Sequence, residues 1–321
     1  MDISQNAIIS EHSKNPFRAL TSYLAAWLVI GAIVLADLLW LRASGLHIAF
    51  GASSHALAAF SALVFVICWT SYRTRTVHAG NEAWITRLRD LAFTGRWMIA
   101  LAAFCTAASV SSHLSAAIGA PLIDDRLVKI DQAVGFDWLT CYRWVRHHPV
   151  LLFVLSLAYG SGLVQMITVP VILGLTGRRV ELIKHVARLM VATFTCLAIA
   201  TAFPAASAFL HFHIMEPGTS ETVSTFFPLR EGALRTIDLT NPQGLVSMPS
   251  MHTAMAILFA YSLRRIPGFA LASFVLNTFM IVSTPTQGGH YLCDIAGGII
   301  LALMVILLIN DRRFEGFFND R

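Results

Sequence analysis

Long apolar stretches constrain this chain more than any other feature of its sequence. A helix needs about 20 mostly apolar residues to cross a bilayer, and eight segments are candidates. The mean hydropathy is +0.66 and 13% of the residues are charged, against about 25% in soluble domains. The sequence therefore predicts an all-α integral membrane protein, a polytopic helical bundle of about eight spans. The predicted spans are residues 19–41, 46–69, 97–120, 150–176, 189–210, 251–263, 268–284 and 291–310.

The distribution of basic residues predicts how these spans are oriented. If the N-terminus lies in the cytoplasm, 16 of the 23 lysines and arginines fall in inner segments and 7 in outer loops. Because basic residues concentrate on the cytoplasmic side of a membrane, we expect both termini to be cytoplasmic. The first apolar stretch starts near Leu20 and is longer than the roughly 7–15 residues of a cleavable signal, so we expect a permanent span. The net charge of +5 then reflects orientation, and we expect no nucleic-acid partner.

A first polar segment lies at the predicted outer start of span 251–263. It covers residues 247–252, with the sequence SMPSMH. Pro249 and Ser250 are signals for the start of a helix, so His252 is expected in the first helical turn. There the free backbone N–H groups and the positive end of the helix dipole favour a phosphate group.

A second polar segment joins the last two predicted spans. It covers residues 283–294, with the sequence STPTQGGHYLCD. Pro285 is expected to end the preceding span, and Gly289 allows the backbone to approach a ligand closely. His290 then opens the last span, and Asp294, four residues later, shares its helix face. A carboxylate in that position can hold one imidazole nitrogen and leave the other free to attack.

The two segments fall on the same side of the membrane, although the orientation was derived from lysine and arginine alone. Two histidines and a carboxylate suit phosphoryl transfer, with one His attacking, one protonating the leaving oxygen and the Asp orienting the nucleophile. Taken singly, His252 also fits a headgroup contact, and His290 with Asp294 a structural pair. A zinc site is a further alternative, but no additional ligand motif is visible, so no metal is expected.

These residues resemble the second and third signature motifs of the type 2 phosphatidic acid phosphatase (PAP2) superfamily. The spacing of the third motif matches from Ser283 through His290 to Asp294. The resemblance implies that His290 is the nucleophile, that Asp294 assists it, and that His252 is the general acid. It also implies a phosphohistidine intermediate and a reaction that needs no metal and no cofactor.

The sequence departs from the phosphatase pattern in two places. The third motif begins with Ser283 and Thr284, where Ser-Arg is usual in the family, and the first motif, Lys-x6-Arg-Pro, is not found. The Ser-Thr variant, together with the run at residues 121–138, is similar to the branch that contains inositol phosphorylceramide synthase. This resemblance implies a transferase, in which an alcohol replaces water as the acceptor.

Both departures from the family motifs remove cations that would bind phosphate, so other groups must contact the phosphate. A pentavalent transition state needs positive charge near its oxygens. We expect Arg235 and Arg230 to supply it, because they lie in the loop that leads to His252. The other expected phosphate contacts are Ser250, Ser283, Thr284 and Gly289. Further outer cations are Arg126, Lys129, Arg143 and Arg146.

The sequence thus predicts a membrane enzyme that acts on a lipid phosphate or phospholipid at the extracytoplasmic face. The acceptor of the phosphoryl group or phospho-headgroup is either water, in a phosphatase, or an alcohol, in a transferase. Residues 1–96 are expected to hold an N-terminal segment, two extra spans and a basic cytoplasmic loop, and residues 97–321 the PAP2-like catalytic domain. The alternative is a transporter or non-catalytic scaffold that keeps the fold, since fold alone does not fix function.

Three polar residues in span 150–176 have two interpretations. Tyr159, Ser161 and Gln165 either line a substrate cavity or form hydrogen bonds between helices. The sequence leaves both open, and hydrogen bonding between helices is the more common use of such residues.

Overall fold

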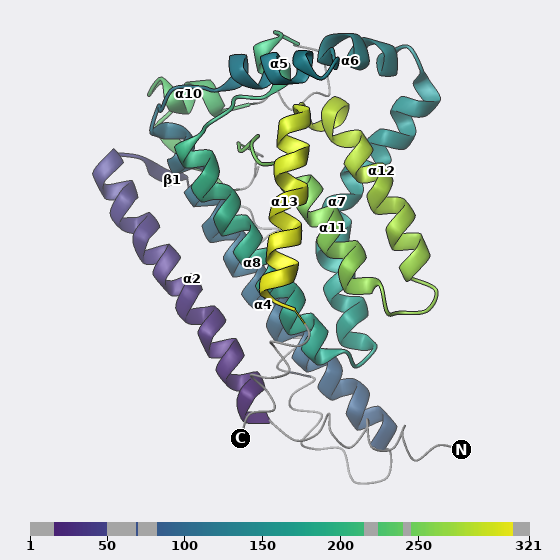
Figure 1. Cartoon of the computed structure of the whole chain (residues 1–321). Helices are drawn as coiled ribbons and strands as arrows, with labels where there is room; N and C mark the ends of the chain where they lie inside the picture. The colour runs from purple at the N-terminus through teal and green to yellow at the C-terminus, as the bar shows by residue number, and fades with distance from the viewer. Residues whose placement is uncertain (1–15, 50–68, 70–81, 215–223, 240–244, 311–321) are drawn as a thin grey trace.

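The chain folds as a helical bundle (Figure 1). The structure, a computed structural model, describes residues 16–49, 69, 82–214, 224–239 and 245–310. In Figure 1 the long helices run roughly along a common direction. They are α2 (Pro16–Ser44), α4 (Glu82–Ala117), α7 (Pro149–Leu175), α8 (Arg179–Ala202), α11 (Met251–Leu263), α12 (Ala270–Gly288) and α13 (Leu292–Leu308).

Several of these helices have the length and composition of membrane spans. In the described part of the chain four are long and apolar enough to cross a bilayer, and α11 and α13 are shorter apolar helices. The predicted count of about eight spans is therefore not confirmed. Predicted span 46–69 lies mostly outside the described residues, and its first residues form the short strand β1 (His47–Ala49) instead of a helix. The four long spans are Leu20–Ser44, Trp84–Ala117, Pro149–Leu175 and Arg179–Ala202.

The predicted span boundaries need correction where polar residues continue a helix. α4 begins at Glu82, so Arg87 and Arg96 lie on one helix with the span and not in a loop. The predicted domain boundary between residues 96 and 97 falls inside this helix. α8 likewise begins ten residues before predicted span 189–210 and ends before it. Hydropathy locates only the apolar part of a helix, whereas backbone hydrogen bonding continues through polar residues at its ends.

Pro285 does not end the preceding helix, contrary to the sequence prediction. α12 continues through Pro285 to Gly288. A proline has no N–H to donate to the carbonyl four residues earlier, which here is that of Ile281. The hydroxyl of Thr284 donates to this carbonyl instead, with an Oγ1–O distance of 2.7 Å. The side chain of Thr284 therefore satisfies the backbone acceptor that the proline leaves without its usual donor.

Large apolar side chains cover much of the outer surface of the bundle. Leu28 on α2, Leu163 on α7 and Leu271 on α12 are 75%, 76% and 74% exposed. Extended exposed apolar surface of this kind marks contact with a membrane or a partner. Together with the long apolar helices, it is compatible with a protein that sits in a bilayer.

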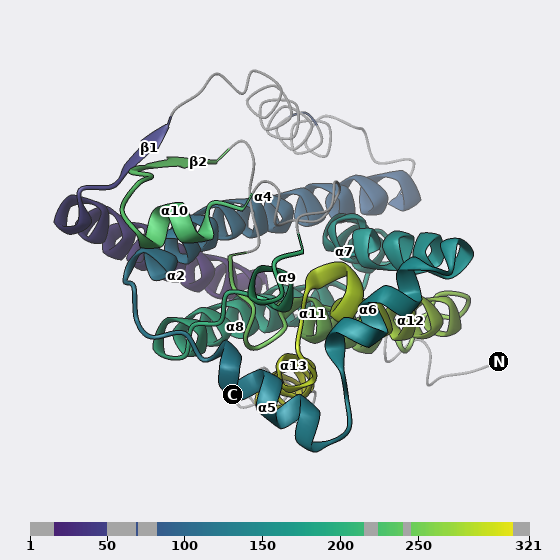
Figure 2. The same ribbon diagram turned by 90° about the horizontal axis from the view of Figure 1, so that it is seen from above.

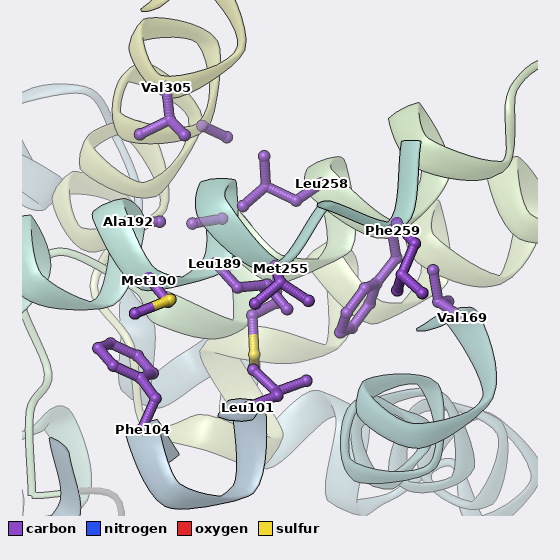
Figure 3. Close-up of a cluster of buried hydrophobic side chains, with 14 of the residues drawn as sticks. Leu101, Phe104, Val169, Leu189, Met190, Ala192, Met255, Leu258, Phe259 and Val305 are labelled. Atoms are coloured by element: carbon purple, nitrogen blue, oxygen red, sulfur yellow. The ribbon is translucent and has the colours of Figure 1, made fainter. Parts of the chain in front are cut away.

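Helix α11 lies inside the bundle, against α7, α8, α12 and α13. Its residues Ala254, Leu258 and Phe259 have no exposed surface, as expected for a helix that is apolar on all sides. Figure 3 shows Leu258 and Phe259 in the buried cluster with Leu189 of α8 and Val305 of α13. This packing fixes α11, and with it the position of the segment at its N-terminus.

Two short helices lie across one end of the bundle, nearly at right angles to the long helices (Figures 1 and 2). They are α5 (Asp124–Ala133) and α6 (Trp138–Arg146), and we call this end the α5/α6 end. α11 and α13 begin at this end, and α8 and α12 finish there. The remaining elements are α9 (Ala208–His211), α10 (Phe226–Arg230) and β2 (Thr236–Asp238), which pairs in parallel with β1.

Candidate functional site

The two polar segments that the sequence singles out meet at the α5/α6 end. The backbone N–H of Ser250 donates to the carbonyl of Asp294, with an N–O distance of 2.9 Å. Two glycines on α13 make this approach possible. A Cβ on Gly298 would lie 2.4 Å from the carbonyl oxygen of Ser250, and one on Gly297 would lie 3.0 Å from the Cβ of Pro249. Sequence reasoning missed both glycines, although a Gly-Gly pair one turn after Asp294 is a signal of close packing.

His290 and Asp294 form the buried pair that the spacing predicts. Nδ1 of His290 lies 3.3 Å from Oδ2 of Asp294. His290 is 4% exposed and Asp294 is fully buried. The same carboxylate oxygen accepts from the hydroxyl of Ser247 at 2.9 Å and from the backbone N–H of Tyr291 at 3.0 Å. These donors fix the carboxylate against Nδ1, and no described residue hydrogen-bonds Nε2 of His290.

His252 lies in the first turn of α11, as predicted, and is held by α7. Its Nδ1 lies 3.2 Å from the hydroxyl oxygen of Tyr159. The two rings stack, with centroids 4.2 Å apart and planes inclined by 22°. On the same helix, a Cβ at Gly162 would lie 3.5 Å from Cδ2 of His252. Tyr159 and Gly162 therefore shape the position that the imidazole occupies.

His290 and Tyr159 both lie close to Gly288, at the end of α12. A Cβ on Gly288 would lie 2.8 Å from Cδ2 of His290 and 2.8 Å from the hydroxyl oxygen of Tyr159. Because that hydroxyl also contacts His252, Tyr159 lies next to both imidazole rings. The structure thus brings together His252, His290 and Asp294, and adds Tyr159.

The hydroxyl groups predicted to contact phosphate are engaged within their own helices. The Ser250 side chain caps α11 and accepts from the backbone N–H of Thr253. The hydroxyl of Ser283 donates to the carbonyl of Met280 at 2.6 Å, and that of Thr284 donates to Ile281. In this arrangement the three hydroxyls stabilise the ends of the helices that carry the site.

The two arginines predicted to neutralise phosphate contact other parts of the protein. Arg230 donates to the backbone carbonyl of Ala120 and lies over the ring of Phe226. Arg235 donates to the carbonyl of Ser44, at the end of α2, with an Nη1–O distance of 3.3 Å. The structure brings neither of them to the histidine pair, and in the described ranges no lysine or arginine hydrogen-bonds to His252, His290 or Asp294. The other outer cations, on α5 and α6, are exposed.

Helix α5 holds the start of α13 through two buried carboxylates. Asp124 accepts from the hydroxyl of Tyr291 at 3.0 Å, and Asp131 accepts from the backbone N–H of Leu292 at 3.0 Å. Burial raises the pKa of the Asp131 carboxyl above its ordinary value, and the hydrogen bond from Leu292 opposes this shift. The two acids are seven residues apart, so they share one helix face. That spacing is the sequence signal that could have identified them.

An aromatic cluster covers the turn between α12 and α13. The indole Nε1 of Trp138, on α6, donates to the carbonyl of Pro285 at 3.1 Å. Phe209 packs edge-on against Trp138, with ring centroids 5.5 Å apart, and reaches Gly289. Gly289 ends α12 with a φ of +64°, a left-handed conformation that glycine adopts without strain.

Replacing Gly289 with Ala is expected to reduce activity far more than it reduces stability. The left-handed backbone costs a non-glycine residue about 1–2 kcal/mol. In addition, the new Cβ would lie 2.5 Å from Cδ2 of Phe209, so the turn that carries His290 must shift. The measurement is turnover and melting temperature in detergent.

Gly268→Ala is the matched control, because Gly268 has a φ of +82° with nothing within 4 Å of the added Cβ. It should carry the same backbone cost without the clash, and leave activity near the wild-type level. Equal activity in Gly289→Ala and Gly268→Ala would contradict the idea that the turn at Gly289 positions His290.

Comparison with known protein families identifies the part of the chain that holds this site. Residues 125–308 match the PAP2 superfamily, and this region includes both motifs and runs from α5 through α13. Searches of the curated proteins and of the solved structures returned no significant match. The matched region is more than half of the 321 residues, and the chain therefore belongs to the PAP2 superfamily.

Proposed function

We propose that this protein transfers a phosphoryl group or phospho-headgroup from a lipid through a phosphohistidine on His290. The observation that carries the proposal is the buried contact between Nδ1 of His290 and Asp294. A carboxylate only accepts hydrogen bonds, so it keeps the proton on Nδ1 and leaves a lone pair on Nε2. An imidazole held in this way is a competent nucleophile.

In the first step, Nε2 of His290 attacks the phosphorus atom of the lipid. The P–N bond forms as the P–O bond to the leaving group breaks, and the electron pair of that bond stays on oxygen. His252 donates a proton to this oxygen, which leaves as an alcohol. The negative charge of Asp294 stabilises the positive charge that develops on the phosphorylated imidazole.

In the second step, the oxygen of an acceptor attacks the phosphohistidine. The P–N bond breaks, a new P–O bond forms, and His252 takes the proton of the acceptor and returns to its starting state. If the acceptor is water, the protein is a lipid phosphatase. If it is an alcohol, the protein is a transferase similar to inositol phosphorylceramide synthase.

We propose that the first turn of α11 supplies part of the charge that the absent cations would provide. The N-terminus of a helix presents free N–H groups and a partial positive charge. The start of α13 lies beside this turn, because the backbone N–H of Ser250 donates to the carbonyl of Asp294. Arg230 and Arg235 remain candidate phosphate ligands, and alanine variants of each test this directly.

We propose further that the site faces the extracytoplasmic side, with both termini in the cytoplasm. The histidines lie at the α5/α6 end, whereas the turns between α7 and α8 and between α11 and α12 lie at the opposite end. Those turns are basic, and basic residues favour the cytoplasmic side. The arginines concerned are Arg178, Arg179, Arg264 and Arg265.

The zinc alternative finds no support in the arrangement of side chains. Over the described ranges, no group of three or more His, Cys, Asp or Glu side chains is placed to hold a metal ion. The roles proposed for His252 and His290, acid catalysis and nucleophilic attack, rest instead on the contacts of the two rings.

Replacing His252 with Ala is expected to slow turnover by about 10²- to 10⁴-fold, the usual contribution of a general acid. Substrate binding should change less, because the attacking residue and the ends of the helices stay in place. The rate of lipid turnover by the purified protein measures this. His147→Ala, at an exposed histidine on the α5/α6 end, is the control. A His252→Ala rate close to that of the control would remove His252 from the mechanism.

The test of the overall function compares the wild type with His290→Ala on a mixed lipid extract that contains candidate alcohol acceptors. Free phosphate and intact lipids are followed by mass spectrometry. Phosphate release that requires His290 would identify a phosphatase, and a new headgroup-bearing lipid would identify a transferase. Identical product profiles for the two proteins would favour the scaffold or transporter alternative.

A further inference from the structure

Tyr159 contacts the imidazole of His252 from a helix outside both motifs. We propose that Tyr159 is the positioning residue for the general acid, holding the His252 ring in both of its protonation states during the reaction. This inference rests on the proposed function, because it gives His252 the role of acid and then base. It assigns to α7 a part of the site that neither motif contains.

The geometry fixes the ring in orientation as well as in place. The Tyr159 hydroxyl lies 3.2 Å from Nδ1, and the phenol ring stacks on the imidazole at 4.2 Å between centroids. The Cδ2 edge of the same ring lies near Gly162, where an added Cβ would be 3.5 Å from Cδ2. Because Nδ1 is engaged, Nε2 is the nitrogen that can reach a leaving oxygen.

The chemistry of a phenol suits this position. A tyrosine hydroxyl both donates and accepts hydrogen bonds, whereas a carboxylate only accepts. When His252 is an imidazolium, Nδ1–H donates to the phenol oxygen. After His252 has given the Nε2 proton to the leaving group, the neutral ring keeps its proton on Nδ1, and Nδ1–H still donates to the phenol oxygen. The hydroxyl therefore remains bonded to Nδ1 in each state.

The two histidines thus differ in the group that holds them. Asp294 fixes the protonation of Nδ1 of His290 and suits a residue that attacks phosphorus. Tyr159 tolerates a change of protonation at His252 and suits a residue that gives and takes a proton. Tyr159 also lies beside His290 across Gly288, so it helps to set the separation of the two rings.

The test exploits the fact that a good leaving group departs without a proton. The first-turnover rate is measured in detergent micelles with dodecyl phosphate, which releases an alkoxide-type leaving group, and with p-nitrophenyl phosphate, which releases a stable phenolate. The variants are Tyr159→Phe, His252→Ala and the control Tyr23→Phe, in a ring that packs on Trp97 in α4. Melting temperatures in detergent verify that each variant folds.

We expect Tyr159→Phe to lower the rate with dodecyl phosphate by about 10- to 100-fold, the range for a lost hydrogen bond to a reacting, charged group. The KM should change little, because the phenyl ring keeps the stacking. With p-nitrophenyl phosphate the loss should be less than about threefold, since departure needs little acid catalysis. Tyr23→Phe should match the wild type on both substrates.

The outcomes separate the inference from the function on which it rests. One outcome is that His252→Ala loses much more rate with dodecyl phosphate than with p-nitrophenyl phosphate while Tyr159→Phe loses rate with neither. In that case Tyr159 is not the positioning residue. Equal losses on both substrates for Tyr159→Phe would indicate a structural role and overturn the inference. If His252→Ala also loses the same rate with both substrates, the proposed function fails and the inference fails with it. The same holds if the wild type shows no phosphate release that depends on His290.

Discussion

His290→Ala is expected to reduce turnover to background, by about 10⁶-fold, the order of loss when a covalent nucleophile is removed from an enzyme. Neither Asp294 nor His252 is expected to replace it, because the carboxylate and the imidazole are held in other positions by their hydrogen bonds. The variant should also fail to form an acid-labile phosphoryl adduct, which rapid quenching of the wild type with labelled substrate should trap.

The control for this variant is His185→Ala. His185 is a fully buried histidine that hydrogen-bonds to Ser262. It lies in the half of the bundle that we place toward the cytoplasm. Its removal tests whether the loss of a buried imidazole alone disturbs the bundle. An adduct that survives in His290→Ala would require a different nucleophile and would overturn the assignment.

Asp294→Ala is expected to have the second largest effect, about 10⁴-fold, as for the orienting carboxylate of a catalytic triad. Its Oδ2 accepts from Ser247, Tyr291 and His290. Alanine would leave all three donors without their acceptor and would free the His290 ring to rotate. Turnover and the yield of the trapped adduct measure the effect.

Asp294→Asn separates hydrogen bonding from charge. The amide oxygen can take the place of Oδ2 and keep the three donors satisfied, while the NH₂ group enters the position of Oδ1. That position is buried and has no hydrogen-bond partner among the described residues, so asparagine loses both the charge and some stability. The variant should fall between wild type and Asp294→Ala. Equal activity of the Asn variant and the wild type would show that the negative charge is not required.

The local part of the site could be predicted from the sequence. The prediction that His290 and Asp294 meet is confirmed, but His290 precedes α13 and so does not lie on its helix face as predicted. The position of His252 in the first turn of α11 follows from the start signals at Pro249 and Ser250. These relations depend on short stretches of chain, which hydropathy and capping rules describe well.

The tertiary part of the site could not be predicted in the same way. Tyr159 reaches His252 across 93 positions of sequence, and no periodic pattern specifies which face of α7 turns toward α11. The continuation of α12 through Pro285 depends on the hydroxyl of Thr284 and on Trp138 from α6. Intrinsic helix propensity marks a proline as a helix end, because propensity takes no account of the hydrogen bonds from Thr284 and Trp138.

The enclosure of α11 has a consequence for how such a protein can diversify. His252, the proposed general acid, stands on a helix surrounded by four others, whereas the turn that bears His290 is held by side chains from α5, α6 and α9. Substitutions in the surrounded helix disturb packing on every side, so few are tolerated. The short crosswise helices have one face outside the bundle and accept sequence change more readily. Under the proposed function, new headgroup preferences would therefore arise in α5 and α6, while the helices that carry the two histidines stay constant.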